Sequence, residues 1–221
     1  MKGMGIVNNE IKNEVERRKI EFLIHFTQCS NLENIFKHGL LPRDVLNQSK
    51  ISSSFNDPFR YDGYTNAVCL SISFPNYKMF YPIRLKPENR NVDWAVIGID
   101  KNILYNLQCG FCINNAACSS ESGVPLYLKT DVKAFNSMFA EYPGKPKRID
   151  MGISTEDPTN PQAEVLVFDR IEVKDIVGVA FENDIVKQKY QSLIPENKEC
   201  ITGREFFYGR ADHRFWGKYG E

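Results

Sequence analysis

The stretch "EFLIHFTQCSNLENIFKHGLLP", residues 21–42, decides how the fold begins. Residues 21–27 form a largely apolar run that leads into His25, Phe26 and Thr27, which indicates a core strand. An apolar stripe with helical spacing follows: Leu32, Ile35 and Phe36. Gly39 then ends the helix, as glycine commonly does just past the last helical turn. This stretch therefore predicts a core strand that turns directly into a short amphipathic helix.

The strand ends on an imidazole and a hydroxyl. His25 and Thr27 are two residues apart, so the alternation of a strand places them on the same face. One interpretation is that His25 is a core histidine whose hydrogen bonds are satisfied inside the protein. The other is that the two side chains bind a ligand, since a paired donor and acceptor suits a sugar hydroxyl or a carboxamide.

The remaining elements are short and the loops between them long. We expect further strands at 67–74, 94–100, 163–169 and 176–182, and helices at 9–19, 131–140 and 184–194. Polar loops are expected at 44–66, 109–126 and 143–162, and loops of this length in a compact domain are usually functional or disordered. This pattern predicts an α+β domain, with small mixed or antiparallel sheets flanked by short helices.

Length and composition limit the class of protein. With 221 residues, 42% of them hydrophobic, the chain is long and apolar enough to form a proper core. We expect a single domain over 1–221, with its core at 20–182 and a C-terminal helix and tail at 183–221. The formal net charge of zero argues against a protein that coats nucleic acid by bulk charge. Neither a membrane span nor a signal peptide is recognisable, so we expect a cytoplasmic protein.

Six cysteines raise the question of a metal site. Cys109 and Cys112 form a CxxC motif, and Cys118 follows in the same loop. A zinc site usually has four ligands, and neither a second cysteine pair nor a nearby histidine completes this set. We therefore expect reduced, buried or half-buried thiols and no bound metal.

Two charged residues stand where charge is unusual. Glu164 begins an apolar strand directly after a proline-rich loop, so it is either a catalytic acid or base or an ordinary glutamate on an edge strand. Arg60 lies in the polar loop 44–66 with Asp57 and Asp62 nearby. It could bind a phosphate with two hydrogen bonds, or form a salt bridge within the loop.

Aromatic and basic residues indicate where bases could stack. Phe74, Tyr77, Phe80 and Tyr81 either stack on a ring of a ligand or belong to the core. Ahead of Glu164 stand three cations: Lys145, Lys147 and Arg148. In the C-terminal tail, cations alternate with rings: Arg204, Phe206, Phe207, Tyr208, Arg210, Arg214, Phe215, Trp216 and Lys218. This alternation suits single-stranded nucleic acid, or alternatively packs the tail on the core.

Taken in order, these signals resemble one known family. "HFT" and "NLENIFKHGLLPRD", then an arginine in a long loop, "YTNAVCLSIS" with "MFY", and finally "QAEVLV" are similar to the DarT family of DNA ADP-ribosyltransferase toxins. The similarity covers roughly residues 21–182. It implies the ADP-ribosyltransferase fold, NAD as co-substrate, and transfer of ADP-ribose onto a base of single-stranded DNA. It also implies a cognate antitoxin, an ADP-ribosyl-DNA hydrolase that removes the mark.

The resemblance assigns roles to individual residues. His25 and Thr27 match the motif that holds the nicotinamide ribose and amide, and Tyr81 matches an aromatic residue beside the nicotinamide. Arg60 matches the loop arginine on the NAD phosphates, and Glu164 matches the catalytic glutamate. The loop 143–162 matches the target-recognition loop. DNA contacts are expected from the basic and aromatic residues: Lys145, Lys147, Arg148, Arg204, Arg210 and Trp216.

The chemistry agrees with this assignment. Nicotinamide leaves NAD through an oxocarbenium-like state, and a carboxylate beside the ribose can stabilise that charge and take a proton from the attacking base.

One departure from the family pattern concerns the base that is modified. Thymidine-modifying members carry an Arg-Ser-Pro run where this chain has "AVCLSISFPNYKMFYPIRL", residues 67–85, so guanine is favoured over thymine. The alternatives are an RNA or protein acceptor, and a module that binds NAD without chemistry.

Overall fold

The structure is a computed structural model that describes residues 7–54 and 60–217. Its strands are β1 (Phe22–Gln28), β2 (Val68–Ile72), β3 (Trp94–Asp100), β4 (Cys109–Cys112), β5 (Glu164–Val167), β6 (Ile176–Phe181) and β7 (Glu199–Thr202). Its α-helices are α1 (Asn9–Arg18), α2 (Leu32–His38), α3 (Arg43–Ser49), α4 (Tyr77–Leu85), α5 (Ile103–Asn106), α6 (Ser119–Ser122), α7 (Val132–Ser137), α8 (Arg148–Met151) and α9 (Asp184–Tyr190). Short 3₁₀ turns lie between them, including Cys29–Asn31, Arg204–Phe207 and His213–Phe215.

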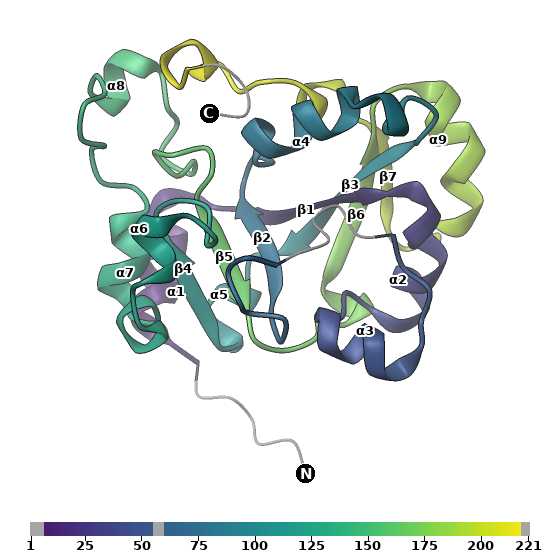
Figure 1. The fold of residues 1–221 in the computed structure, drawn as a ribbon, viewed down its shortest axis with the longest axis horizontal. Coiled ribbons are helices and arrows are strands. Elements are labelled where there is room, and N and C mark those ends of the chain that lie inside the picture. The colour runs from purple at the N-terminus through teal and green to yellow at the C-terminus, as the bar shows by residue number, and fades with distance from the viewer. Residues whose placement is uncertain (1–6, 55–59, 218–221) are drawn as a thin grey trace.

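The strands form one seven-stranded sheet in the order β4-β5-β2-β1-β3-β6-β7. Neighbouring strands are antiparallel except for β6 and β7, which are parallel. The sheet is therefore mixed, and the predicted α+β class is confirmed. Figure 1 shows α1, α5, α6 and α7 gathered near β4 and β5, with α2, α3 and α9 toward the other end.

Strand β1 lies in the middle of the sheet and is buried on both faces. Leu23 belongs to the large core cluster that also takes Ile11 and Val15 from α1. Ile24, the next residue, belongs to a second cluster with Phe80 of α4. This division follows from the strand alternation, which sends successive side chains to opposite faces. Helices on both faces thus hold β1 in place.

The sheet splits beside β1, and this split opens the space for a site. All seven residues of β1 pair with β3, but only Leu23 and Ile24 pair with β2. The earlier residues of β2, from Val68 to Leu70, pair with β5 instead. Figure 1 shows β2 crossing the direction of β1 rather than running along it. The second half of β1, which carries His25 and Thr27, is therefore free of a neighbouring strand on that side.

Three loops predicted from the sequence contain regular structure. The loop 44–66 overlaps helix α3, the loop 109–126 contains β4 and α6, and the loop 143–162 contains α8. β4 was missed because its sequence CGFC has weak strand preference by itself. It forms because its four residues pair with β5 and are all buried. Strand β7 was also missed, and it is stabilised by its parallel pairing with β6.

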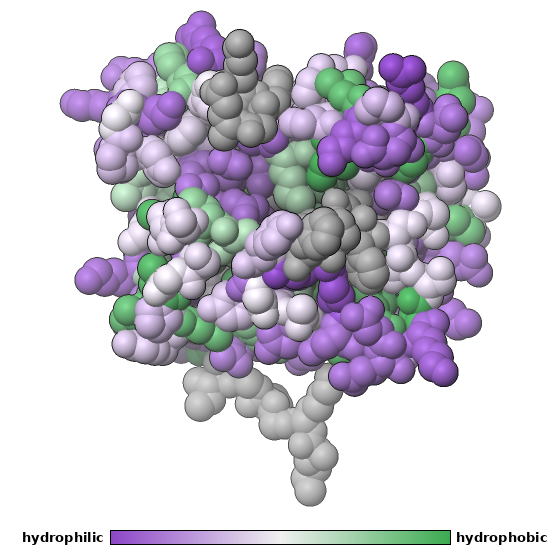
Figure 2. All heavy atoms as spheres, in the orientation of Figure 1, coloured by the Kyte–Doolittle hydropathy of each residue, from purple (hydrophilic) through white to green (hydrophobic). Residues whose placement is uncertain are grey.

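On the face that Figure 2 shows, the described residues form no large hydrophobic area. Figure 2 shows hydrophilic residues over most of that face, with hydrophobic residues in small separate groups. Among the described residues, every helix is too short or too polar to cross a bilayer.

Candidate active site

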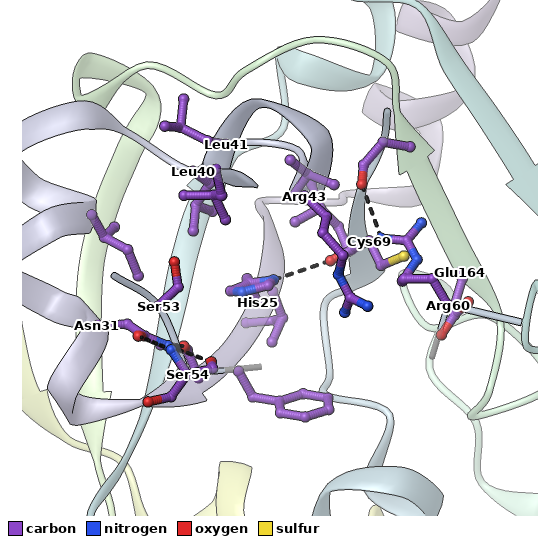
Figure 3. Close-up of a pocket in the computed structure, with 18 of the residues that line it drawn as sticks. His25, Asn31, Leu40, Leu41, Arg43, Ser53, Ser54, Arg60, Cys69 and Glu164 are labelled. Carbon is purple, nitrogen blue, oxygen red and sulfur yellow. Dashed lines mark hydrogen bonds between the residues drawn. The ribbon is translucent and has the colours of Figure 1, made fainter. Parts of the chain in front are cut away.

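A cavity opens where β1 and β2 splay apart. It encloses about 1290 Å³, including the part open to solvent. His25 and Thr27 line it from β1, Arg60 from the loop before β2, and Glu164 from the start of β5. Figure 3 shows His25 on one side of the cavity and Arg60 with Glu164 on the other. The structure thus brings together four residues that are up to 139 positions apart in the sequence, from 25 to 164.

The partner of His25 determines which of its nitrogens faces the cavity. Nδ1 lies 3.1 Å from the carbonyl oxygen of Cys69. A carbonyl oxygen only accepts, so Nδ1 carries the proton and Nε2 is the acceptor. Burial lowers the pKa of His25, against the opposing effect of the hydrogen bond to Cys69, so the ring is neutral at neutral pH. The cavity therefore receives an acceptor from His25, suited to an amide N–H or a ribose hydroxyl.

Thr27 is buried and is part of a small hydrogen-bonded group. The Asn31 side chain donates to Thr27 Oγ1 over 2.9 Å and to the Ser54 carbonyl over 2.9 Å. Its Oδ1 accepts from the Ser54 N–H over 2.8 Å. Asn31 thereby connects β1 to residues 51–54, which form part of the cavity wall. Thr27 Oγ1 already accepts a bond, and its own O–H is the remaining donor for a ligand.

Glu164 is only 8% exposed, and its two oxygens are held by one loop. Asn115 donates to Oε1 over 2.9 Å, and the Ala116 N–H donates to Oε2 over 2.9 Å. The Asn115 Oδ1 in turn accepts from the Ala117 N–H over 3.0 Å, which fixes the orientation of the amide. Glu164 is therefore not an exposed edge-strand residue, which was the alternative interpretation. Asn115 is a site residue that sequence reasoning missed, although the "INNAA" run directly after Cys112 offered a signal.

Arg60 is held tightly by its own loop. Its guanidinium forms a bidentate pair with Asp62, with Nε and Nη2 2.9 and 2.8 Å from the two oxygens. It also donates to the carbonyls of Ala67, over 3.0 Å, and Tyr64. Burial by itself would lower the pKa of Arg60, but the hydrogen bond and charge of Asp62 outweigh it and raise the pKa. The loop salt bridge that was one alternative is thus present, with Asp62. Asp57 lies outside the described residues.

Tyr81 is not among the residues that line the cavity, so its expected place beside a nicotinamide stays a prediction that the cavity does not support. Tyr81 lies on α4, and its ring centroid is 6.3 Å from that of Tyr208. Met79 and Asn76 line the cavity from this segment instead. The physical reason is that residues two apart on a helix point in different directions, so Met79 and Tyr81 cannot share the cavity face.

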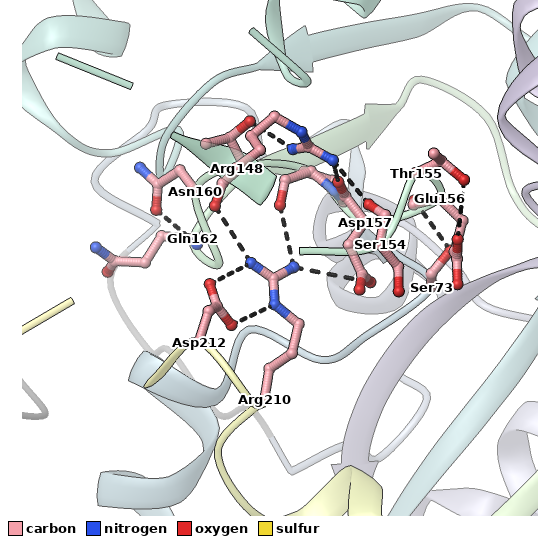
Figure 4. Close-up of polar contacts among 12 residues, drawn as sticks. Ser73, Arg148, Ser154, Thr155, Glu156, Asp157, Asn160, Gln162, Arg210 and Asp212 are labelled. Atoms are coloured by element: carbon pink, nitrogen blue, oxygen red, sulfur yellow. Dashed lines mark hydrogen bonds and ion pairs between the residues drawn. The ribbon is translucent and has the colours of Figure 1, made fainter. Parts of the chain in front are cut away.

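Most of the expected DNA-binding cations have partners inside the chain (Figure 4). Arg210 is 8% exposed, pairs with Asp212 at 2.7 and 2.8 Å, and donates to the carbonyls of Pro158 and Thr159. Arg148 donates to Thr159 Oγ1, over 2.6 Å, and to two carbonyls of the same loop. Because their donors are used for these contacts, both arginines hold the loop before β5 in shape.

The last described residues also form contacts inside the chain. Trp216 is buried, and its Nε1 donates to Asp212 over 2.6 Å. Lys145 Nζ donates to the Phe215 carbonyl over 2.8 Å and lies 5.2 Å from the Trp216 ring centroid. The C-terminal segment therefore packs on the core. Two of the expected DNA-binding residues stay exposed, Lys147 and Arg204, the latter over the ring of Tyr208. Lys218 lies outside the described residues.

The cysteines are free thiols, three buried and three half-buried. Burial raises the pKa of Cys109 and of Cys112 to about 12, so both thiols stay protonated near neutral pH. Within residues 7–54 and 60–217, no group of three or more potential ligands from His, Cys, Asp and Glu is arranged to hold a metal ion.

Comparison with known proteins supports a single family. The sequence model of the family described as "ssDNA thymidine ADP-ribosyltransferase, DarT" matches residues 24–205. The search of curated proteins found no match.

Solved structures show a similar fold at low identity. The Thermosipho africanus DarTG in complex with ADP-ribose has a TM-score of 0.59 and 15% identity, over 85% of this chain and 51% of that chain. The present chain thus spans about half the length of that protein. The Thermus sp. 2.9 DarT in complex with NAD⁺ has a TM-score of 0.54 and 16% identity, over 86% of this chain and 98% of that chain. The same DarT with ADP-ribosylated ssDNA has a TM-score of 0.58 and 14% identity, over 86% and 97%.

Proposed function

The chain belongs to the DarT family of single-stranded DNA ADP-ribosyltransferases and is an NAD-dependent enzyme of that class, and from this we propose how its own residues carry out the transfer. We propose that the cavity between β1 and β2 binds NAD and that Glu164 is the catalytic residue. The single observation that carries this proposal is the place of Glu164, which is held by two N–H donors at the wall of the same cavity as His25.

The chemistry of the cavity wall suits a dinucleotide. Its walls are apolar along α2 and α3, where Ile35, Leu41 and Leu46 can pack on a ring. The neutral His25 offers an acceptor from Nε2, and Thr27 offers a hydroxyl donor. Ligand sites are commonly apolar clefts with a few well-placed polar groups. His25 and Thr27 are therefore proposed to orient the nicotinamide ribose and amide.

Glu164 is proposed to act twice in the transfer. The bond from ribose C1′ to the nicotinamide nitrogen breaks, and a bond from C1′ to a nitrogen of the base forms. The Glu164 carboxylate stabilises the positive charge that develops on the ribose. It also accepts the proton that the base nitrogen loses. Both roles need a carboxylate in a fixed orientation, which Asn115 and Ala116 provide.

The modified base is proposed to be guanine, with thymine, which the family description names, as the alternative. The Arg-Ser-Pro run of thymidine-modifying members is absent from residues 67–85, which form β2 and α4. This segment lines the cavity with Ser71, Asn76 and Met79. Ser71 follows Leu70, the partner of Val165, so it lies beside Glu164 at the end of the strand pair. The sequence departure thus includes a part of the cavity wall that lies beside Glu164.

The test of the base is a mass measurement. The protein is incubated with NAD and with four short single-stranded oligonucleotides that differ only at one central base. A gain of one ADP-ribose on the guanine oligonucleotide alone supports the proposal, whereas a gain on the thymine oligonucleotide alone replaces guanine by thymine. Consumption of NAD with every oligonucleotide unchanged would move the acceptor to RNA or protein.

The role of Glu164 is tested in the same assay. Glu164→Gln keeps the shape and the contact with the Ala116 N–H but removes the charge, and we expect transfer to fall at least about 100-fold. Glu33→Gln is the matched control, because Glu33 is exposed on α2 and does not line the cavity. Circular dichroism establishes that both variants are folded. Transfer by Glu164→Gln at the rate of the control would reject the assignment.

Two further features belong to the proposal. Residues 1–221 are proposed to form one ADP-ribosyltransferase domain, because β7 near the C-terminus pairs with β6 of the same sheet. A cognate antitoxin that hydrolyses ADP-ribosyl-DNA is proposed as partner, in line with the DarTG name of the Thermosipho protein. Single-stranded DNA is proposed to contact Lys147 and Arg204, the exposed cations of the set.

A further inference from the structure

A lysine and a glutamate are buried next to the loop that holds Glu164. Lys129 is 3% exposed and Glu121 is 4% exposed, and neither is among the residues that line the cavity. Lys129 Nζ lies 2.9 Å from Glu121 Oε2 and donates to the Glu121 carbonyl over 2.8 Å. It also donates to Cys112 Sγ over 3.6 Å. An ammonium group has three donors, so these contacts use all of them.

The stability of the fold does not by itself account for this ion pair. Burial would lower the pKa of Lys129, but its hydrogen bond to Glu121 and the charge of that carboxylate help to raise it, so Lys129 stays charged. A buried ion pair adds little net stability, because removing two charges from water costs about as much as their attraction returns. The place of the pair in the chain indicates a different role.

A run of hydrogen bonds connects the pair to the two donors of Glu164. The Glu121 N–H donates to the Cys118 carbonyl over 2.9 Å, and the Cys118 N–H donates to the Asn115 carbonyl over 2.9 Å. The Asn115 amide and the N–H of the next residue, Ala116, donate in turn to the two oxygens of Glu164. The loop between β4 and α6 is thus a series of turns whose far end is fixed by the ion pair.

The other end of this loop is fixed by the same lysine. Cys112, which accepts the third Lys129 donor, is the last residue of β4 and lies opposite Glu164 in the sheet. Lys129 therefore joins the two ends of the loop 113–118, with Cys112 before it and Glu121 after it. A loop held at both ends keeps its donors in one orientation, which is what a carboxylate in a fixed position requires.

We propose that Lys129 and Glu121 are positioning residues for Glu164: their ion pair closes the loop 113–118 and so holds the two N–H donors over the carboxylate. The pair acts only through this loop and does not touch the substrate. This inference rests on the proposed function, since it takes Glu164 as the catalytic residue. It assigns a role in the reaction to two charges that lie outside the cavity.

The test replaces both charges together. Lys129→Met with Glu121→Met removes the ion pair and fills the space with apolar side chains. A single substitution would leave the other charge buried without a partner, and would lower the melting temperature for that reason alone. The double variant should melt within about 4 °C of the wild type, because such replacements are often neutral. Thermal unfolding followed by circular dichroism measures this.

The kinetic readout is DNA transfer by the same double variant, with the oligonucleotide that the wild type modifies. The kcat should fall about tenfold or more, because the donors of Glu164 are no longer held in place. The KM for NAD should change less than about threefold. Lys12→Met with Glu16→Met is the matched control, since this ion pair of α1 has side chains that are 44% and 58% exposed. The control should keep the kcat of the wild type.

A further variant tests whether the pair acts through the loop. In an Asn115→Ala background, the loss of the ion pair should lower kcat by a smaller factor than in the wild type. One of the two donors that the pair positions is then already absent, and residues that act as a unit are not additive.

Three outcomes overturn the inference and leave the proposed function standing. The first is a folded double variant with the kcat of the control. The second is a double variant that does not fold, because the pair then holds the whole fold rather than the loop. The third is an equal loss of kcat with and without Asn115. If the wild type modifies no oligonucleotide, or if Glu164→Gln transfers at the wild-type rate, the proposed function fails and the inference fails with it.

Discussion

Asn115 and Glu164 are 49 positions apart, and the side-chain amide of Asn115 donates to Oε1 of Glu164 over 2.9 Å. The contact exists because β4 and β5 pair so that Cys112 lies opposite Glu164. The chain then turns directly after Cys112 and returns Asn115 and Ala116 over the carboxylate. The strand pairing therefore places a polar loop over the residue proposed to carry the chemistry.

Asn115→Ala should lower kcat of DNA transfer about 10- to 100-fold, because the Glu164 carboxylate then loses one of its two fixed donors and its orientation. The KM for NAD should change less than about threefold, since the NAD-binding walls are intact. Asn115→Asp should be at least as slow, because it replaces a donor by a second negative charge. Steady-state kinetics with each variant measures both constants. The control is Asn106→Ala, an exposed asparagine at the end of α5. A change in KM alone would show that Asn115 acts on substrate binding rather than on Glu164.

Arg210→Gln should destabilise the fold by about 3 kcal/mol, because Asp212, 1% exposed, would keep a buried charge without its bidentate partner. The Arg210 bonds to the carbonyls of Pro158 and Thr159, a few residues before Glu164, would be lost as well. Urea denaturation followed by circular dichroism gives the free energy of unfolding. Arg214→Gln removes an exposed arginine of the same segment and should change it by less than about 0.5 kcal/mol. Equal midpoints for the two variants would contradict the stabilising role of Arg210.

Asp157 should make the fold less stable as the pH rises toward neutral. Burial raises the pKa of Asp157 from 3.8 to about 6, despite the opposing charge of Arg210. A carboxyl whose pKa is raised by folding stabilises the protein below its unfolded pKa, and this contribution is lost as pH rises through about 6. Asp157→Asn cannot ionise, so its advantage over the wild type should grow between pH 4 and pH 7.5, by on the order of 2 kcal/mol.

The measurement for Asp157 is urea unfolding of both proteins across that pH range. Asp150→Asn, at an exposed position of α8 in the same loop, is the control and should follow the wild type at every pH. If the wild type and Asp157→Asn gave parallel curves, Asp157 would not carry the pH dependence.

Gly39→Ala should be far more destabilising than an ordinary substitution of a turn glycine. Gly39 has φ +81°, and a Cβ there would lie 2.2 Å from the Ile171 carbonyl oxygen. That oxygen accepts the Leu40 N–H, so the clash would separate the two segments that this hydrogen bond joins. Gly152 has a similar φ, +70°, with open space around it. Gly152→Ala should therefore cost about 1 kcal/mol, the backbone cost alone.

Chemical denaturation of the two glycine variants separates the loss of unfolding free energy caused by the steric clash from the loss caused by the backbone conformation. Gly39→Ala should lose at least about 2 kcal/mol more than Gly152→Ala, because overpacking against a backbone atom adds to the backbone cost. Equal losses would mean that the 38–42 segment can move away from Ile171 without breaking its contacts.

The amino-acid sequence was sufficient to predict those features that depend on neighbouring residues. The apolar run that leads into His25, Phe26 and Thr27 predicted β1. The spacing of Leu32, Ile35 and Phe36 predicted α2, because burial of one helix face requires that spacing. Glu164 and His25 could be selected because a charged or polar residue in a core strand is costly without a purpose or a partner. The mixed α+β class followed from the order of short strands and helices.

Which side chains meet depends on how the strands are ordered in the folded protein. The fixing of Glu164 by Asn115, the use of Arg60 by its own loop, and the contact of Lys129 with Cys112 all depend on that order. The same holds for Arg210 and Trp216. They lie in a segment that alternates cations and rings, a pattern that suits DNA binding, but their partners are Asp212 and the loop before β5. An arginine or an asparagine has the same local pattern whether its donors face a ligand or another part of the chain. The choice is made by long-range pairing, such as that of β4 with β5, and no local pattern encodes it.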